Sequence, residues 1–186
     1  MPRKRTPSRG RGRPSGGCAL DERGRRRERR GRRREHPLAK YDSMRDFSRT
    51  PEPAPHPAPL EGELTFVVQQ HRATRMHYDL RLEFGGGMKS WPIPRGPSTN
   101  PADKRLAVMT EDHPLDYASF EGIIPRGQYG AGEVIVWDNG TYSPDEGGAL
   151  SFLDRAEAER RMLAELAAGK ISVTFEDASS RARGPW

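Results

Sequence analysis

Apolar and polar residues alternate in short runs from residue 64 onward, and Gly and Pro separate these runs. The runs are rich in β-branched and aromatic residues, a pattern typical of a compact β-rich domain. They predict strands over residues 64–70, 76–84, 89–91, 106–111, 132–137, 140–142 and 171–176. The pair Asn139-Gly140 favours a hairpin turn between the fifth and sixth of these strands.

Helical spacing of apolar residues predicts two helices. The first is short and lies within residues 38–47. The second, Ser151–Ala168, starts with Ser151-x-x-Asp154, a variant of the capping box, and ends at Gly169 in the C′ position. We expect its apolar stripe to pack on the outside of a sheet or barrel. The stripe consists of Phe152, Ala156, Leu163, Leu166 and Ala167.

Composition divides the chain into three regions. Residues 1–36 consist mainly of Arg, Gly, Pro, Ser and Glu, and they carry 15 Lys and Arg against 4 Asp and Glu. The whole chain has a net charge of +6, so its basic character belongs to this tail, whose composition predicts disorder. Residues 37–63 hold the short helix and a Pro-rich arm that is expected to be extended. Residues 64–186 form the β-rich domain.

The tail has two interpretations. Its charge is suited to binding phosphate backbones without sequence preference, and the alternative is compositional drift. A single cysteine, Cys18, excludes an internal disulfide and favours a reducing compartment. No apolar run has the length of a signal peptide or a membrane span. We therefore expect a cytoplasmic monomer with no membrane partner.

The segment R-M-H-Y-D-L-R-L-E-F, residues 75–84, alternates without interruption. Its apolar residues share one face of a strand, while His77, Asp79 and Arg81 follow one another on the opposite face, roughly 6 to 7 Å apart. His71 ends the preceding strand. The five residues between the two histidines are enough for a hairpin that brings both imidazoles together.

Two imidazoles and a carboxylate on adjacent strands form a three-ligand site with open positions, which suits Mn²⁺, Fe²⁺ or Zn²⁺ as a Lewis acid. Structural zinc usually has four ligands that include cysteine. The alternative is an ordinary solvated strand face without a function. Metal binding is favoured because His71, His77 and His113, three of the five histidines, fall within 43 residues that also hold several arginines.

Positive charge beside this site indicates an anionic substrate. Arg81 would lie next to the metal, where a fixed guanidinium suits phosphate. Arg95 and Arg105 would add charge from other strands, the alternative for each being a plain surface arginine. His113 is a candidate proton donor because its usual pKa is near neutrality. The Gly-rich run of residues 125–132 lacks the ending of a nucleotide-binding P-loop and is interpreted as a tight turn.

Four motifs follow in one order: H-R-A-T-R-M-H-Y-D-L-R-L-E, M-K-S-W-P-I-P-R-G-P-S, R-L-A-V-M-T-E-D-H-P-L-D-Y and I-P-R-G-Q-Y-G-A-G-E-V-I-V-W-D. Together they strongly resemble the 3′-phosphoesterase domain of bacterial and archaeal DNA ligase D, over about residues 38–176. The resemblance implies a mainly β fold, a small β-barrel with flanking short helices. It also implies an Mn²⁺-dependent enzyme, with Zn²⁺ or Co²⁺ as other metals. Such an enzyme removes a ribonucleotide or a phosphate from DNA 3′ ends and leaves a 3′-hydroxyl in double-strand-break repair by end joining.

The resemblance further implies roles for individual residues. The metal ligands would be His71, His77 and Asp79. Phosphate would be handled by Arg81, Arg105, His113 and Tyr117, with Arg95 acting mainly in removal of a terminal phosphate. The segment R-D-F-S-R-T-P-E-P resembles the family's N-terminal motif and would give Asp46 and Glu52 supporting roles in the active site. Water or a neighbouring ribose 2′-hydroxyl would attack, while His113 would help the leaving oxygen depart.

Two other functions fit parts of the pattern. A DNA-binding accessory module that has lost catalysis and recruits a ligase or polymerase needs cations, but not the His/His/Asp set. A cupin-like small-molecule metalloenzyme does not need arginines around its metal. We therefore expect the enzyme, associated with the nucleoid and acting on DNA 3′ ends, with the ligase and polymerase of end joining supplied in trans.

Overall fold

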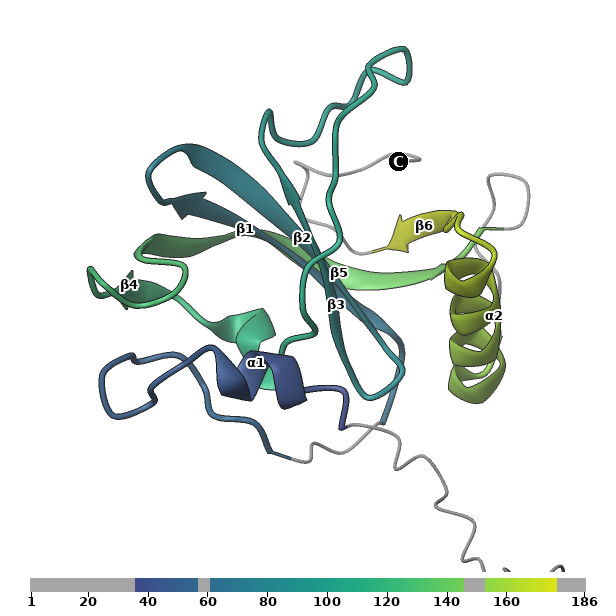
Figure 1. Cartoon of the computed structure of the whole chain (residues 1–186). Coiled ribbons are helices and arrows are strands. Elements are labelled where there is room, and N and C mark those ends of the chain that lie inside the picture. The colour runs from purple at the N-terminus through teal and green to yellow at the C-terminus, as the bar shows by residue number, and fades with distance from the viewer. Residues whose placement is uncertain (1–35, 57–60, 146–152, 177–186) are drawn as a thin grey trace, which may run out of the picture. The chain divides into compact units, whose positions relative to one another are not determined.

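The computed structural model describes residues 36–56, 61–145 and 153–176 (Figure 1). In chain order the elements are α1 (Ala39–Ser43), β1 (Thr65–Arg72), β2 (Met76–Phe84), β3 (Gly87–Ile93), the 3-10 helix η1 (Leu115–Ser119), β4 (Gly122–Ile124), β5 (Gly132–Pro144), α2 (Arg155–Ala167) and β6 (Val173–Glu176). The Arg-rich tail that is predicted to be disordered lies outside the described residues. Within the described part of the chain, no helix is both long and apolar enough to span a membrane.

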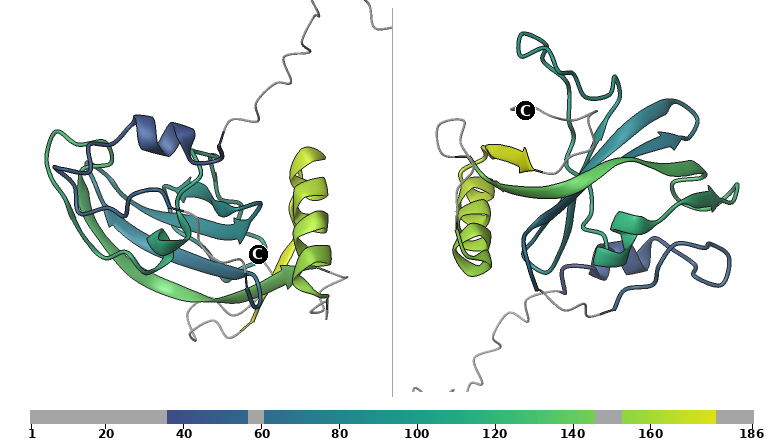
Figure 2. Two further views of the ribbon diagram at one scale, coloured as in Figure 1. Left: turned by 90° about the horizontal axis from the view of Figure 1, so that it is seen from below. Right: turned by 180° about the vertical axis from the view of Figure 1, so that it is seen from behind.

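All of these strands belong to one antiparallel sheet with the order β3-β2-β1-β5-β4, and β6 pairs with β5 beside this path. The sheet curls into half of a barrel, with α1 and α2 against different parts of it (Figure 2). The predicted mainly β, barrel-like fold with short flanking helices is therefore confirmed.

Strand alternation separates an apolar core from a polar face. Phe66, Val68, Leu82 and Phe84 point to one side, where Met162 of α2 completes the core. On the other side of the sheet, Gln69, His71, Asp79 and Arg81 are also buried, beneath a second apolar cluster. That cluster consists of Tyr41, Tyr117, Phe120, Ile124 and Val134. Most of the polar face of the hairpin is therefore buried, with His77 partly exposed, so the interpretation as a solvated strand face is wrong.

Two strand predictions are wrong. The Asn139-Gly140 pair makes no hairpin, because β5 runs through it and pairs Asn139 with Val67 and Gly140 with Phe66 of β1. Pairing with a long neighbouring strand thus overrides the turn preference of this dipeptide. Residues 106–111 form no strand either: they run beside β3, with backbone bonds from Val108 N to Pro92 O and from Thr110 N to Ser90 O at 3.3 and 2.9 Å. The short strand β4 was not predicted.

The helix α2 has fewer residues than the predicted helix Ser151–Ala168, and it turns a different face toward the core. Asp154 is its N-cap and accepts a hydrogen bond from the Glu157 amide, so the expected capping box is not the one that forms. Gly169 has φ +80° just after the helix, as predicted. The buried residues are Ala158 and Met162, one turn apart. The predicted stripe is therefore wrong for Ala156, Leu163 and Ala167, which are exposed, while Leu166 packs on the core and Phe152 lies outside the described residues.

Candidate metal centre and adjoining pocket

The β1–β2 hairpin brings the two predicted imidazoles together. His71 and His77 are direct partners in the antiparallel register, with ring centroids 4.6 Å apart. Asp79 follows two residues later on the same face. One ligand atom from each of His71, His77 and Asp79 lies within 4.8 Å of the others, so the three side chains converge on one point.

Backbone carbonyls fix the orientation of both rings. His71 Nε2 lies 2.9 Å from Gly130 O, and His77 Nδ1 lies 3.0 Å from Arg75 O. A carbonyl only accepts hydrogen bonds, so in each ring this nitrogen carries the proton. The lone pairs of His71 Nδ1 and His77 Nε2 are left facing Asp79, at 3.6 and 3.7 Å from its carboxylate oxygens.

This donor set fits a divalent transition metal. Three acceptors face one another with no proton between them, at distances too long for hydrogen bonds. Two ligand atoms that each lie about 2.0 to 2.2 Å from the same ion are separated from each other by distances similar to the 3.6 and 3.7 Å found here. The carbonyl bonds to His71 and His77 are the usual supports of metal-bound imidazoles. Burial raises the pKa of Asp79 and the positive charge of Arg81 lowers it, and the pKa lies below its usual value.

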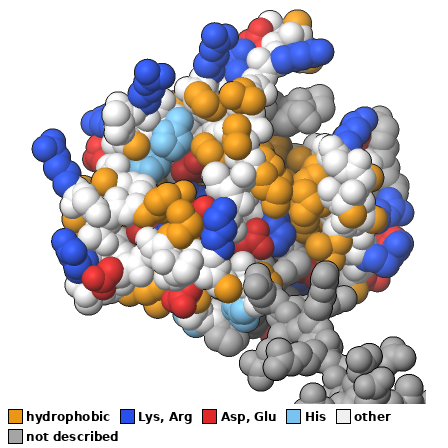
Figure 3. Space-filling view, in the orientation of Figure 1, with side chains coloured by type: hydrophobic (Ala, Val, Ile, Leu, Met, Phe, Trp, Pro, Cys, Tyr) orange, Lys and Arg blue, Asp and Glu red, His pale blue; other side chains and the backbone are white. Residues whose placement is uncertain are grey.

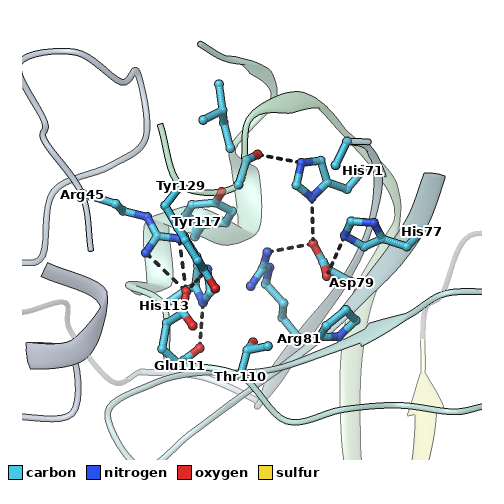
Figure 4. Close-up of a pocket in the computed structure, with 14 residues that line it drawn as sticks. Arg45, His71, His77, Asp79, Arg81, Thr110, Glu111, His113, Tyr117 and Tyr129 are labelled. Atoms are coloured by element: carbon cyan, nitrogen blue, oxygen red, sulfur yellow. Dashed lines mark hydrogen bonds and ion pairs between the residues drawn. The ribbon is translucent and has the colours of Figure 1, made fainter. Parts of the chain in front are cut away.

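A pocket of about 280 Å³ adjoins the three ligands. His71, His77 and Asp79 lie on one side of it, Arg81 lies near the middle, and Arg45, Glu111, His113, Tyr117 and Tyr129 lie on the other side (Figure 4). On the face of the molecule in Figure 3, histidine side chains reach the surface near the β1–β2 turn, with Lys and Arg side chains around them.

Arg81 is a buried and fixed cation. Its guanidinium donates to Gln69 Oε1 at 2.8 Å, to Ser90 Oγ at 2.7 Å and to Asp79 Oδ2 at 3.2 Å. The Gln69 amide in turn donates to the carbonyls of residues 117 and 120. The guanidinium carbon also lies 4.6 Å from the ring centroid of Tyr117. These contacts fix the conformation of the Arg81 side chain and hold its positive charge beside the ligand set.

Arg45, which follows α1, provides a second buried cation. Its Nε donates to Glu52 at 2.8 Å, its Nη2 lies 3.2 Å from His113 Nε2, and its guanidinium carbon lies 3.8 Å above the Tyr41 ring. Glu52 also accepts a hydrogen bond of 2.9 Å from the Tyr117 hydroxyl. Burial raises the pKa of Tyr117, so this hydroxyl keeps its proton.

His113 is neutral in this setting. Its Nδ1 lies 3.0 Å from Glu111 O and carries the proton, because the carbonyl only accepts. Nε2 is thus an acceptor toward Arg45. Burial, together with the charges of Arg81 and Arg45, holds the pKa of His113 well below its usual value.

Most of the predicted site residues meet in this pocket. It is lined by His71, His77, Asp79, Arg81, His113 and Tyr117. Glu52 lies directly behind the pocket lining. The structure does not bring the other three to the pocket: Asp46 is exposed and bonds Ser48, Arg95 is exposed, and Arg105 pairs with Asp103 at 2.8 Å.

Sequence reasoning missed several residues of the pocket. Arg45 stands next to Asp46 in the motif R-D-F-S-R-T-P-E-P, yet the motif alone did not distinguish which of its charges turns inward. Glu111 lies in the segment R-L-A-V-M-T-E-D-H-P-L-D-Y, at the end of a predicted strand that does not form. The Gly-rich run does turn, and it also supplies Tyr129 and Gly130 to the pocket wall.

The sequence of this chain is similar to a known family and to known proteins. Residues 69–186 match the family model described as the DNA ligase D 3′-phosphoesterase domain. Over 110 residues the chain is 57% identical to a multifunctional non-homologous end joining protein LigD of Pseudomonas aeruginosa and 53% identical to a multifunctional non-homologous end joining DNA repair protein LigD of Mycobacterium tuberculosis. These matches cover 58% and 59% of this chain, but only 13% and 14% of the relatives.

Proposed function

Because the chain belongs to the DNA ligase D 3′-phosphoesterase domain family, we propose that it is a metal-dependent phosphoesterase that processes DNA 3′ ends for end joining. It removes a terminal ribonucleoside as a phosphodiesterase and a terminal phosphate as a phosphomonoesterase, and so produces 3′-hydroxyl ends. The names of the relatives support end joining as the setting. The ligase and polymerase of that process would use the ends that it produces.

One observation carries this proposal: the free lone pairs of His71 and His77 and the Asp79 carboxylate converge beside the fixed guanidinium of Arg81. His71, His77 and Asp79 would hold the ion. We propose Mn²⁺, with Zn²⁺ or Co²⁺ as alternatives. When bound, the metal would supply Lewis-acid activation of a phosphate oxygen.

The other side chains have distinct roles in this scheme. Arg81 and Arg45 neutralise the charge that develops on the phosphate oxygens, and their buried positions strengthen this effect. The Tyr117 hydroxyl donates its one proton to Glu52, so its proposed part in phosphate handling is to hold Glu52, the partner of Arg45, in place. A bound phosphate anion opposes the effect of the two arginines on His113 and raises its pKa, so that Nε2 takes up a proton and passes it to the leaving oxygen.

Three predicted residues keep proposed roles outside the pocket. Arg95 and Arg105 belong to the segment that follows β3, and we propose that they contact DNA phosphates beyond the reacting one. Asp46 accepts hydrogen bonds from the amide and hydroxyl of Ser48. Its proposed role is to shape the arm that carries Arg45 and Glu52.

A primer-template with a modified 3′ end on its primer tests the proposal directly. The protein is incubated with Mn²⁺ and a primer-template whose primer ends in a ribonucleotide or a 3′-phosphate, and the products are separated on a sequencing gel. We expect a 3′-hydroxyl product from the wild type and from His56→Ala, a control histidine outside the pocket. We expect none from His77→Ala. Unchanged primer with retained DNA binding in the wild type would instead identify the accessory module.

A further inference from the structure

The Gly-rich loop between β4 and β5 places an aromatic ring at the mouth of the pocket. Tyr129 lines the pocket but is 46% exposed, whereas Tyr117, the other tyrosine in the lining, is buried. In Figure 4, Tyr129 lies over the side of the pocket that holds Arg45, Glu111 and His113. A large exposed aromatic at this position is not explained by the core, because it belongs to neither apolar cluster.

Residues of the pocket hold this ring in place. The guanidinium carbon of Arg45 lies 5.3 Å from the Tyr129 ring centroid, and Arg45 is itself fixed on Tyr41. Burial raises the pKa of the Tyr129 hydroxyl, and Glu111 acts in the same direction. The next residue, Gly130, bonds His71 through its carbonyl. One face of the ring is therefore directed toward a buried cation, while the residue as a whole is 46% exposed.

We propose that Tyr129 is the stacking platform for the base of the terminal ribonucleoside, the group that leaves in the phosphodiesterase reaction. This inference rests on the proposed function. The buried cations and the ligand set suit the phosphate, and Tyr129 is an exposed aromatic in the lining of the same pocket, where the nucleoside attached to that phosphate can contact it. His113, assigned to the leaving oxygen, lies on the same side as Tyr129. Stacking on an aromatic ring tolerates any base, as an end-processing enzyme requires.

The test compares two primers that differ only at the terminal residue: one ends in a ribonucleotide, the other in a ribose without a base. Stacking of one base is worth about 1 to 3 kcal/mol, so we expect the wild type to prefer the first primer by roughly 5- to 150-fold in kcat/KM. Tyr129→Leu should lose this preference by reacting more slowly with the first primer alone. Tyr129→Phe should keep it, because stacking needs the ring and not the hydroxyl.

Each other outcome has a defined meaning. Equal losses on both primers in Tyr129→Leu would show that the ring only supports Arg45, and a wild type without preference for the base would also overturn the inference. Leu163→Ala, which removes an exposed apolar side chain from α2, is the matched control and should behave as the wild type. Absence of hydrolysis of any primer by the wild type would instead refute the proposed function.

Discussion

His71 and His77 face each other across the β1–β2 hairpin, and each ring nitrogen that points away from Asp79 is bonded to a backbone carbonyl. The two carbonyls come from different places, one from the hairpin turn at Arg75 and one from the β4–β5 loop at Gly130. The lone pairs are thus oriented by the fold itself. A metal that binds here meets ligands that have already lost most of their rotational freedom.

Gly132 is expected to control this arrangement, because it lets β5 start close to the hairpin turn. Its φ is +152°, and a Cβ there would lie 2.6 Å from Arg72 O and 2.9 Å from Ala73 Cα, both backbone atoms. We expect Gly132→Ala to lower the free energy of unfolding by about 2 to 3 kcal/mol and to weaken metal binding. Gly62→Ala is the control, since its φ is also positive but nothing lies within 4 Å. Urea denaturation of both variants separates the clash from simple strain, and equal losses would refute the close-approach argument.

Arg45 is expected to stabilise two buried carboxylates. Its guanidinium pairs with Glu52 at 2.8 Å and with Glu111 at 3.4 Å, and all three side chains are at most 4% exposed. Removing one partner of a buried ion pair costs about 3 to 5 kcal/mol, so Arg45→Met should lose stability in that range at pH 7. Arg49→Met, at an exposed position of the same arm, is the control. A loss in Arg45→Met no larger than that in Arg49→Met would contradict the ion-pair explanation.

The lowered pKa of His113 makes the free energy of unfolding depend on pH. Its pKa in the folded protein lies well below 6.5, because the ring is buried and faces Arg81 and Arg45. As the pH falls below about 6.5, the unfolded chain takes up this proton first, so the free energy of unfolding decreases by up to about 1.4 kcal/mol per pH unit. Above that pH the contribution is fully present. Urea denaturation with a chelator present, at pH 7.0 and 5.5, should show a smaller decrease in His113→Gln than in the wild type. The same decrease in both proteins would show that His113 is not the group responsible.

The strand that carries the chemistry was predictable with the bounds that the structure shows, residues 76–84, because its alternation is unbroken. The convergence of His71 with His77 also followed from the length of the turn. The side of the pocket that holds Arg45 and Glu111 could not be predicted from the sequence. These two residues come from an arm and a loop whose paths depend on packing around Tyr41 and not on local periodicity.

The α2 stripe and the Asn139-Gly140 turn failed for a related reason. Leu163 and Met162 are adjacent in a helix, and apolar character alone does not decide which of them faces the sheet; the pairing of Met162 with the small Ala158 one turn earlier does. At Asn139, the pairing of the continuous thirteen-residue strand β5 outweighs the local preference for a turn.

Titration of the protein with Mn²⁺, followed by the electron paramagnetic resonance signal of the free ion, tests the central claim most directly. The wild type and His56→Ala should each bind one ion per chain at the site formed by His71, His77 and Asp79, and His77→Ala should lose most of this binding. A wild type that leaves the free-ion signal unchanged, or a His77→Ala variant that titrates as the wild type does, would contradict the account.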